Sequence, residues 1–430
     1  MDAIEYLFSL EKFGIKFGLA NIRALCAALG QPQNEFRSVL IAGTNGKGSV
    51  TAMVDRGLRA AGLHVGRYTS PHLIHLEERF AIDGQPVSRA TLVEAIDRVR
   101  GHVESLLVSG ALEAPPTFFE VTTAMAFDMF RRAEVEFAVL EVGLGGRLDS
   151  TNCVEPIAAA ITSIAFDHEQ YLGHTLAEIA TEKAGVMRPG IPVVIGPLDP
   201  EARAAVAAAG DAAGAWLVDA MDGVIVGAGT ATYPSSITVK TPTRDYGRLT
   251  PGLRGAHQIP NAIVALRLLE ELSRTVPVSP DAIVAGLSDV EWRGRLQLVE
   301  TAGGRKVLLD AAHNPAGAAA LSAYLTQEFP PLPLVFGAMR DKDASEMLRI
   351  LLPAASMLVV TEPGNARARP AAELAALARS IAPACRIEVE PDPMAALDRA
   401  WNEQSMICAA GSIFLIGDLL NGLDARRNRP

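Results

Sequence analysis

The stretch Gly43-Thr44-Asn45-Gly46-Lys47-Gly48-Ser49 contains the residue types that proteins use to hold phosphate. Its glycines let backbone N–H groups approach an anion, and Lys47 supplies a full positive charge. Ser49 or Thr51 supplies a hydroxyl for a phosphate or for its Mg²⁺. The strict P-loop pattern is broken because Gly48 separates Lys47 from Ser49. The stretch therefore predicts a loop for nucleotide phosphates, with a plain strand-to-helix turn as the alternative.

An acidic residue follows the apolar segment 137–140, which predicts a buried strand. In sheets with helices on both faces, ligands collect where the strands end. Glu141 stands at such an end, and a lone buried carboxylate is costly unless it is paired or binds a metal. Two interpretations follow: Glu141 binds a Mg²⁺ that faces the phosphate loop, or it forms a salt bridge with Arg147 or another neighbour.

Three further side chains each have a functional and a structural interpretation. Ser70 and His168 both follow a predicted strand, and each is either a ligand or an ordinary turn or cap residue. Lys183 lies in the last turn of a predicted helix, where a cation meets the negative end of the helix dipole. By itself that position indicates only a surface lysine.

The second half of the chain has a similar group. Asp310 and His313 follow the predicted strand 306–309 and precede a helix. They either cap that helix or contact a nucleotide bound between two domains. Arg295 is either part of an interdomain salt bridge or a clamp for phosphate.

The composition limits the possible function classes. The 430-residue chain is 49% hydrophobic and 20% charged, which is typical of a folded globular protein. Its net charge of -10 argues against a nucleic-acid binder, and its four dispersed cysteines argue against a zinc site or disulfide framework. The N-terminus lacks a basic region, and no apolar run is long enough to cross a membrane. We therefore expect a cytoplasmic protein without membrane partners.

The phosphate loop lies in a predicted strand–helix–strand unit, which implies a parallel sheet. A boundary near residues 291–295 divides the chain into a domain 1–293 and a smaller domain 294–430, and both have an α/β pattern. The predicted strands are 39–41, 65–69, 77–82, 137–142, 157–164, 192–195, short pieces in 216–250, a hairpin of 296–301 and 306–309 with its turn at 302–304, then 333–337, 357–361, 386–390 and 412–416. The predicted helices are two in 1–30, then 50–61, 89–108, 117–133, 175–184, 201–213, 261–273, 315–328, 343–352, 370–381 and 393–403.

Taken together, these motifs resemble the bacterial dihydrofolate synthase/folylpolyglutamate synthase family, the folate branch of the Mur ligase superfamily. The resemblance runs nearly end to end, and the Lys-Gly-Ser order that breaks the strict P-loop is this family's own form. The segments that carry it are 43–49, Thr69-Ser70-Pro71-His72, 141–149, Asp167-His168, 182–185, His257-Gln258, Asn261-Ala262, Gly294-Arg295, Asp310, 312–315 and Gly411-Ser412.

The resemblance implies a P-loop-type ATPase domain followed by a Rossmann-like domain, and a ligase that adds L-glutamate to dihydropteroate or to folylpolyglutamates through an acyl phosphate. It implies two Mg²⁺ ions, ATP as co-substrate, room for a monovalent cation, and a monomer. The implied ATP contacts are Asn45, Gly46, Lys47, Gly48, Ser49, Asn261, Arg295 and Asp310. The implied metal ligands are Ser70, Glu141, His168 and a carbamylated Lys183, and His313 joins Lys47, Glu141, His168 and Lys183 as a catalytic residue.

The resemblance also implies the acceptor side of the site and leaves several questions open. The implied contacts to the pterin substrate are Gly18, Leu19, Thr117, Phe118, Phe119, Glu120, Leu148, Asp149 and Ser150. Two positions depart from the family pattern: Glu77 replaces an Asn, and Arg293 replaces a Pro. The competing hypotheses are a Mur-type ligase for a UDP-sugar peptide and a nucleotide-dependent switch, and whether the enzyme also makes dihydrofolate stays open.

Overall fold

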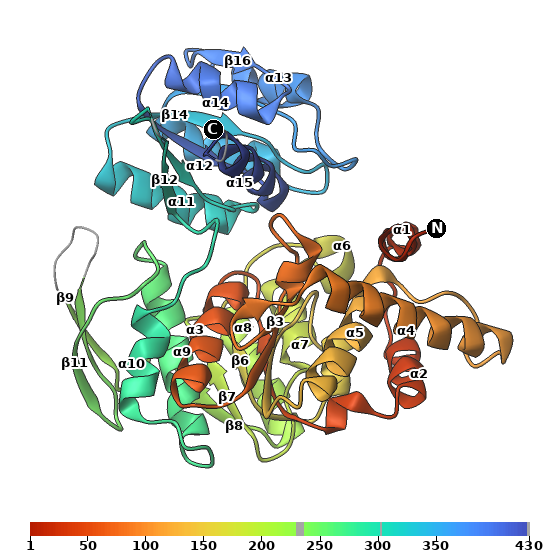
Figure 1. Ribbon diagram of the computed structural model, residues 1–430. Coiled ribbons are helices and arrows are strands. Elements are labelled where there is room, and N and C mark those ends of the chain that lie inside the picture. The colour runs from red at the N-terminus through yellow and green to blue at the C-terminus, as the bar shows by residue number, and fades with distance from the viewer. Residues whose placement is uncertain (229–235, 302, 428–430) are drawn as a thin grey trace.

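The computed structural model describes residues 1–228, 236–301 and 303–427. It consists of two lobes, each built around one large sheet (Figure 1). The N-terminal lobe includes every element up to α10, and the C-terminal lobe begins at β12. In Figure 1 the C-terminal lobe lies above the N-terminal lobe, with the connecting segment between them. The predicted α/β fold is confirmed.

The eight-stranded sheet of the N-terminal lobe has the order β4-β3-β2-β5-β1-β6-β7-β8. The strands in the order β2-β5-β1-β6-β7-β8 run parallel to one another, whereas β3 and β4 form an antiparallel edge beside β2. The strand that leads into the phosphate loop therefore lies near the centre of the sheet. The strands are β1 (Arg37–Ala42), β2 (Val65–Tyr68), β3 (Phe80–Ile82), β4 (Gln85–Pro86), β5 (Phe137–Glu141), β6 (Pro156–Ile161), β7 (Pro192–Ile195) and β8 (Trp216–Asp219).

Helices cover both faces of this sheet because successive side chains of a strand point to opposite faces. On β1, Val39 and Ile41 pack with α3, α9 and α10, whereas Leu40 and Ala42 belong to the core on the other face. The helices are α1 (Ala3–Ser9), α2 (Ala20–Ala28), α3 (Lys47–Ala60), α4 (Arg89–Val108), α5 (Phe118–Arg132), α6 (Glu169–Leu172), α7 (Leu176–Ala184), α8 (Pro200–Ala213), α9 (Gln258–Leu272) and α10 (Pro280–Ser288).

The turn between β1 and α3 requires glycine at two positions. Gly43 and Gly46 have φ angles of 141° and 85°, which side chains with a β-carbon rarely adopt. A β-carbon on Gly43 would collide with Oγ1 of Thr162, and one on Gly46 would collide with Oδ1 of Asn261. The backbone of the loop is therefore enclosed by the end of β6 and by α9.

A small antiparallel sheet packs beside α9 and α10 at one end of the N-terminal lobe (Figure 1). Its strands are β9 (Ile225–Ala228), β10 (Ile237–Lys240) and β11 (Asp245–Leu249). Buried Glu270 of α9 accepts hydrogen bonds from Thr241 and from Tyr246, which attaches the small sheet to the lobe. The strand-like pieces predicted in this region are therefore present.

The C-terminal lobe has a six-stranded sheet in the order β12-β13-β17-β14-β15-β16. Only β12 is antiparallel to its neighbour, so the hairpin forms the sheet edge. Three helices (α11–α13) pack on one face and two (α14, α15) on the other. The elements are β12 (Gln297–Glu300), β13 (Lys306–Leu309), α11 (Pro315–Glu328), β14 (Leu332–Phe336), α12 (Ala344–Leu351), β15 (Ala355–Val360), α13 (Ala371–Ile381), β16 (Ile387–Val389), α14 (Pro393–Trp401), β17 (Met406–Ala410) and α15 (Ile413–Arg427).

Four element predictions were wrong or incomplete. The predicted strand 412–416 is the start of α15, and the strand is β17, because Gly411 (φ 115°) ends the apolar run 406–410 and turns the chain. Residues 77–79 belong to a short 3₁₀ helix, η3 (Leu76–Arg79), because Glu78 caps the backbone before it. The helices α6 and α10 were not predicted.

Two further points concern the extent of the description. Ala302, which belongs to the predicted hairpin turn, lies outside the described residues. Among the helices that the structure describes, none combines the length and the apolarity needed to cross a membrane.

Candidate active site

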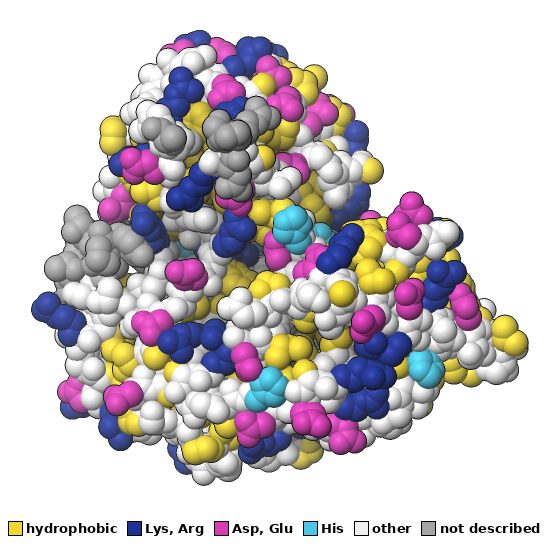
Figure 2. Space-filling model, in the orientation of Figure 1, with side chains coloured by type: hydrophobic (Ala, Val, Ile, Leu, Met, Phe, Trp, Pro, Cys, Tyr) yellow, Lys and Arg dark blue, Asp and Glu magenta, His cyan; other side chains and the backbone are white. Residues whose placement is uncertain are grey.

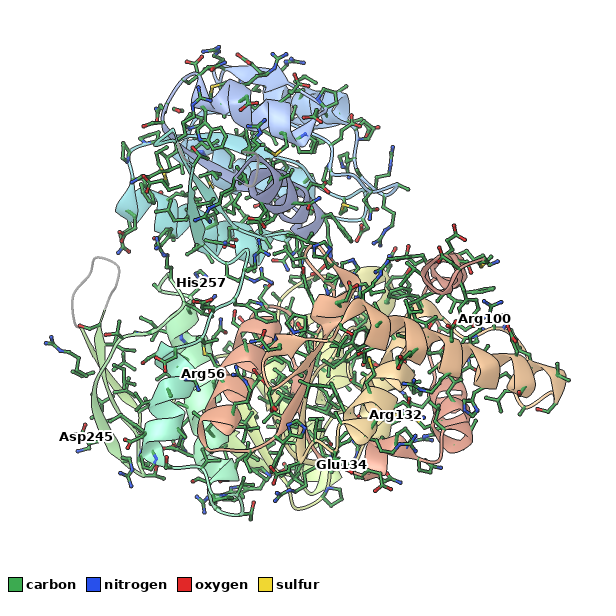
Figure 3. All side chains as sticks on the ribbon, viewed as in Figure 1. Arg56, Arg100, Arg132, Glu134, Asp245 and His257 are labelled. Carbon is green, nitrogen blue, oxygen red and sulfur yellow. The ribbon has the colours of Figure 1, made fainter. Side chains whose placement is uncertain are left out.

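A cleft of about 980 Å³ lies between the two lobes. Figure 2 shows the hollow where the lobes meet, with basic side chains at its rim. His257, at the start of α9, lies at this junction (Figure 3). The structure brings together in this cleft thirteen residues predicted for phosphate, metal or nucleotide: Asn45, Gly46, Lys47, Gly48, Ser49, Ser70, Glu141, His168, Lys183, Asn261, Arg295, Asp310 and His313. Thr51, the alternative to Ser49 as the source of a hydroxyl, is fully buried and does not line the cleft.

Lys47 begins α3 and folds back over the phosphate loop. Its Nζ donates to the carbonyl oxygens of Gly43 (3.0 Å) and Thr44 (3.1 Å). Burial lowers the pKa of Lys47, although nearby Glu141 opposes this shift. No carboxylate of the described residues forms an ion pair with Lys47. Its charge is therefore held at the loop by backbone carbonyls and remains available to an anion in the cleft.

Glu141 ends β5 directly beside the phosphate loop. Its side chain is buried, and Oε2 accepts a hydrogen bond from the backbone N–H of Ser70 at 3.2 Å. Arg147 pairs with Glu182 at 2.7 Å, so the predicted alternative of a Glu141–Arg147 salt bridge is wrong. Burial raises the pKa of Glu141, while Lys47 lowers it. A buried carboxylate with so few partners has unused capacity for a cation.

Lys183 is a buried residue and not the surface lysine that its position in the helix indicated. It lies in the last turn of α7 with 4% exposure, and its Nζ donates to the carbonyl oxygen of Gly43 at 2.9 Å. Both lysines, Lys47 and Lys183, therefore donate to the same carbonyl. Burial and the charge of Lys47 lower the pKa of Lys183 to about 7. A substantial fraction of its amine is thus neutral and nucleophilic near neutral pH.

His168 adopts a left-handed conformation (φ 53°) at the start of α6. Its Nε2 lies 3.3 Å from Nζ of Lys342, which comes from the C-terminal lobe. Burial and Lys342 lower the pKa of His168 to about 4, so the ring is neutral at neutral pH. A neutral imidazole has one nitrogen with a free lone pair, which suits it to a metal or a proton.

Asp167 connects the two lobes. Its Oδ1 lies 2.6 Å from Nζ of Lys342, and each of these side chains is only 10% exposed. Its Oδ2 accepts from Nδ2 of Asn314 at 3.1 Å and lies 3.7 Å from Nε2 of His313. Burial alone would raise the pKa of Asp167, but Lys342 and the two histidines lower it.

A second contact between the lobes involves the phosphate loop itself. Nδ2 of Asn314 donates to Oδ1 of Asn45 at 3.0 Å, while Oδ1 of Asn314 caps α11 by accepting from Gly317 at 2.8 Å. The loop that begins α3 is therefore in direct contact with the start of α11. His313, next to Asn314, has its Nδ1 2.9 Å from the carbonyl oxygen of Ala311, and burial lowers its pKa to about 4.

The remaining predicted nucleotide contacts come from both lobes: Asn261 lies on α9 beside Gly46 of the phosphate loop, and Arg295 and Asp310 lie at the start of the C-terminal lobe. Asp310 accepts from the backbone N–H groups of Leu296 and Ala312, both at 2.9 Å, so it fixes the start of the lobe without capping α11. Nδ2 of Asn261 donates to Gln258 at 2.9 Å. Arg295 lines the cleft and forms no ion pair with a described carboxylate, so its guanidinium is available to a ligand.

The residues predicted for the pterin substrate do not line this cleft. Thr117 and Glu120 form the capping box of α5, and Asp149 caps the short helix η4 (Ser150–Cys153). Phe119 packs against the backbone of Gly143, which itself lines the cleft. The other members of this predicted set lie in the same part of the N-terminal lobe or in the loop before α2: Gly18, Leu19, Phe118, Leu148 and Ser150.

The sequence did not single out three residues that form contacts between the two lobes at the cleft: Asp167, Asn314 and Lys342. The first two belong to motifs that carry the family resemblance, but no role was predicted for them. Lys342 lies in the triplet Asp341-Lys342-Asp343, which follows the end of the buried strand β14. A charged residue after the carboxyl end of a parallel strand is the signal that would have identified it.

The side chains around Glu141 fit a magnesium ion. Glu141 is a buried carboxylate that forms no ion pair with any described cation, and the adjacent Ser70 supplies a hydroxyl oxygen. Within the described residues there is no group of three His, Cys, Asp or Glu side chains that would enclose a metal by itself. One carboxylate and one hydroxyl form the donor set expected for Mg²⁺, which uses one or two carboxylates and takes its other ligands from water and phosphate.

Two family descriptions match the chain. The Mur ligase middle domain matches residues 41–269, and the Mur ligase glutamate ligase domain matches residues 294–413. The chain is 36% identical over 356 residues to a dihydrofolate synthase/folylpolyglutamate synthase of Bacillus subtilis, covering 81% of this chain and 82% of the relative. It is 34% identical over 425 residues to a probable bifunctional folylpolyglutamate synthase/dihydropteroate synthase of Haloferax volcanii, of which it spans about half the length (50%).

Solved structures agree with these matches. A Mycobacterium tuberculosis folylpolyglutamate synthase complexed with ADP and AMPPCP is similar with a TM-score of 0.91 and 34% identity, and the similarity covers 100% of both chains. The Escherichia coli FolC in complex with DHPP and ADP is similar with a TM-score of 0.86 and 27% identity over 100% of this chain and 99% of that chain.

Proposed function

The chain belongs to the Mur ligase family, in its folylpolyglutamate/dihydrofolate synthase branch, and we propose that it joins L-glutamate to a carboxylate of dihydropteroate or of a folylpolyglutamate at the expense of ATP. One observation carries this proposal. Lys47 and Lys183 both donate to the carbonyl oxygen of Gly43, and Glu141 lies near Lys47. These three residues line one cleft together with His313 and Lys342 of the other lobe.

Formation of an amide bond in water requires an activated carboxylate. In the proposed reaction, a carboxylate oxygen of the acceptor attacks the γ-phosphorus of ATP, and ADP leaves. The amine of glutamate then attacks the carbonyl carbon of the acyl phosphate, and inorganic phosphate leaves. Two anions must meet in the first step, so the site must supply positive charge to the transferring phosphoryl group.

Several residues of the cleft are suited to hold ATP. The backbone of residues 45–49 and the side chain of Lys47 are suited to hold the phosphates. Two features support this role: Gly46 is left-handed, and the N-terminus of α3 begins in this loop. Arg295 has an available guanidinium, and Asn261 and Asp310 also line the cleft. ATP would therefore span from the N-terminal lobe to the start of the C-terminal lobe.

Ser70 and Glu141 would hold one Mg²⁺, and Glu141, His168 and Lys183 would support a second. When bound, Mg²⁺ neutralises charge on the phosphate oxygens of ATP. In the carbamylated form that we propose, Lys183 carries a carboxylate-like oxygen. The lowered pKa of Lys183 supports this proposal because a neutral amine is the form that reacts with carbon dioxide.

Closure of the lobes would protect the acyl phosphate from hydrolysis. The pair Asp167–Lys342 and the Asn45–Asn314 hydrogen bond support this role because each joins the phosphate side of the cleft to the C-terminal lobe. For the acceptor we propose the region around Phe119, Leu148, Asp149 and Ser150, which adjoins the cleft at Gly143 and Leu144.

The test is a comparison of acceptors. Purified enzyme is incubated with ATP, Mg²⁺, L-glutamate and one acceptor: tetrahydrofolate, dihydropteroate or a UDP-linked peptide precursor. We expect glutamate-dependent phosphate release and a product heavier by one glutamyl residue with a pteridine acceptor, and the comparison of the two pteridines decides whether the enzyme is bifunctional. Release with the UDP-linked acceptor alone would contradict the proposal, as would ATP binding without acceptor-dependent release.

A further inference from the structure

The loop after β2 contains a histidine, His72, with one ring nitrogen that has a protein partner. Nε of Arg79 donates to Nδ1 of His72 at 2.9 Å, and the His72 ring lines the cleft. An arginine side chain has only hydrogen-bond donors, so Nδ1 of His72 must be the acceptor. The proton of the neutral ring is therefore on Nε2.

The partner of His72 is a buried cation without a carboxylate. Arg79 is 7% exposed, and none of the described carboxylates lies within ion-pair distance of its guanidinium. One face of the guanidinium lies 5.1 Å from the centre of the Phe118 ring. A buried charge without a counter-ion is costly, and a ligand carboxylate near His72 would offset that cost.

The position of this pair relates it to the reaction centre. His72 follows Ser70 by two residues in one loop, and Ser70 contacts Glu141, where the acceptor's reacting carboxylate must meet ATP. On its other side, Arg79 contacts Phe118 in the proposed acceptor region. The pair therefore lies between the phosphate side of the cleft and the proposed binding region for the aromatic part of the acceptor.

We propose that His72, oriented by Arg79, binds the α-carboxylate of the terminal glutamyl residue of the acceptor. A folylglutamate has this carboxylate close to its reacting γ-carboxylate, whereas dihydropteroate has only the reacting one. His72 thus favours glutamylated acceptors by donating from Nε2, and Arg79 is a positioning residue that fixes the tautomer and adds positive charge. This inference rests on the proposed function, because it assumes a carboxylate acceptor at Ser70 and Glu141.

The test compares two acceptors in two variants. In His72→Phe we expect the KM for tetrahydrofolate to rise about tenfold or more, because the variant loses one charge-assisted hydrogen bond to the acceptor. The KM values for dihydropteroate and ATP should stay within about threefold of the wild-type values. Arg79→Met should show the same split, and Arg79→Lys, which keeps a donor and the charge, should partly restore tetrahydrofolate binding. His75→Ala is the control, because His75 is an exposed histidine of the same loop outside the cleft.

Equilibrium binding of the same acceptors in the presence of a non-hydrolysable ATP analogue, measured by calorimetry, needs no turnover. His72→Phe should weaken tetrahydrofolate about tenfold and leave dihydropteroate unchanged. An equal loss for both acceptors, no loss for either, or an effect on ATP alone would overturn the inference. Wild-type protein that binds both acceptors but joins glutamate to neither would overturn the proposed function. The binding data for His72→Phe would then decide the inference by themselves.

Discussion

The cleft and the proposed acceptor region use their polar side chains in opposite ways. In the cleft, Glu141 has one weak backbone partner, Lys47 contacts only carbonyl oxygens and Arg295 has no counter-ion among the described carboxylates. In the acceptor region, Glu120 accepts from Thr117 and from Asn21, and Asp149 accepts from the backbone of Leu144 and Thr151.

This difference separates two kinds of contribution to a binding site. Polar groups that satisfy one another stabilise the fold and hold a surface in shape. Polar groups that are buried without full partners cost stability and are therefore expected where a ligand completes them. By this criterion we place the proposed chemistry in the cleft, and we expect the proposed acceptor region to supply shape and an apolar surface.

The largest effect is expected for the residues with the fewest partners. Lys47→Ala and Glu141→Ala should each lower ATP-dependent glutamate ligation by at least about a thousandfold, because each removes charge that stabilises the transferring phosphoryl group. Both proteins should retain the circular dichroism and the unfolding midpoint of the wild type, since neither side chain forms an ion pair within the described residues. Near-normal ligation by folded Glu141→Ala would rule out the metal assignment.

Substitution of Lys183 tests whether this buried lysine is carbamylated. Lys183→Ala should lose about a hundredfold or more in kcat, because an oxygen ligand and a positioned charge disappear together. Acetate or another short carboxylic acid should partly restore activity by taking the place of the carbamate. Mass spectrometry under carbon dioxide provides a second readout. Full activity of the variant without added acid would show that carbamylation has no role.

The contact between the lobes should have an intermediate effect. Lys342→Ala should lower kcat/KM by about ten- to a hundredfold, which corresponds to about 1.4–2.8 kcal/mol. The reason is that Asp167 then remains buried and unpaired in the closed arrangement. Lys306→Ala is a matched control, since Lys306 pairs with Glu300 at the surface. The double variant Lys342→Ala/Asp167→Asn should lose less than the sum of the single changes, and full additivity would contradict a direct pair.

The smallest effect is expected where polar groups already satisfy one another. Thr117→Ala removes the N-cap of α5 and should lower the free energy of unfolding by about 1 kcal/mol. Ser88→Ala removes the cap of α4 and should have a similar cost. Thr117→Ala alone should also raise the acceptor KM, by about threefold, because Phe118 and Phe119 follow the cap. If the two variants had equal acceptor KM values, the acceptor region would have to lie elsewhere.

The sequence alone predicted the parts of the site that depend on local order. A loop between a strand and a helix needs glycines at left-handed positions, so residues 43–49 were recognisable from their composition. An acid that ends an apolar strand was recognisable in the same way, at Glu141. Burial of Lys183 was not recognisable, because it depends on how α7 packs against the phosphate loop, and local reasoning favoured the surface.

The parts that sequence reasoning missed depend on contacts distant along the chain. Lys342 meets Asp167 across a separation of 175 residues, which no local pattern encodes. The error at 412–416 has a different cause, since an apolar run identifies burial but not the type of element. Only the turn at Gly411 separates β17 from α15.

Formation of an acyl phosphate by the acceptor can be followed with an oxygen isotope. Tetrahydrofolate carrying ¹⁸O in its γ-carboxylate is incubated with enzyme, ATP and L-glutamate, and the released phosphate is analysed by mass spectrometry. Attack of that carboxylate on the γ-phosphorus transfers one labelled oxygen to phosphate for each amide bond formed. Phosphate that carries one ¹⁸O per product is the result expected here, and unlabelled phosphate accompanying labelled amide product would contradict the account.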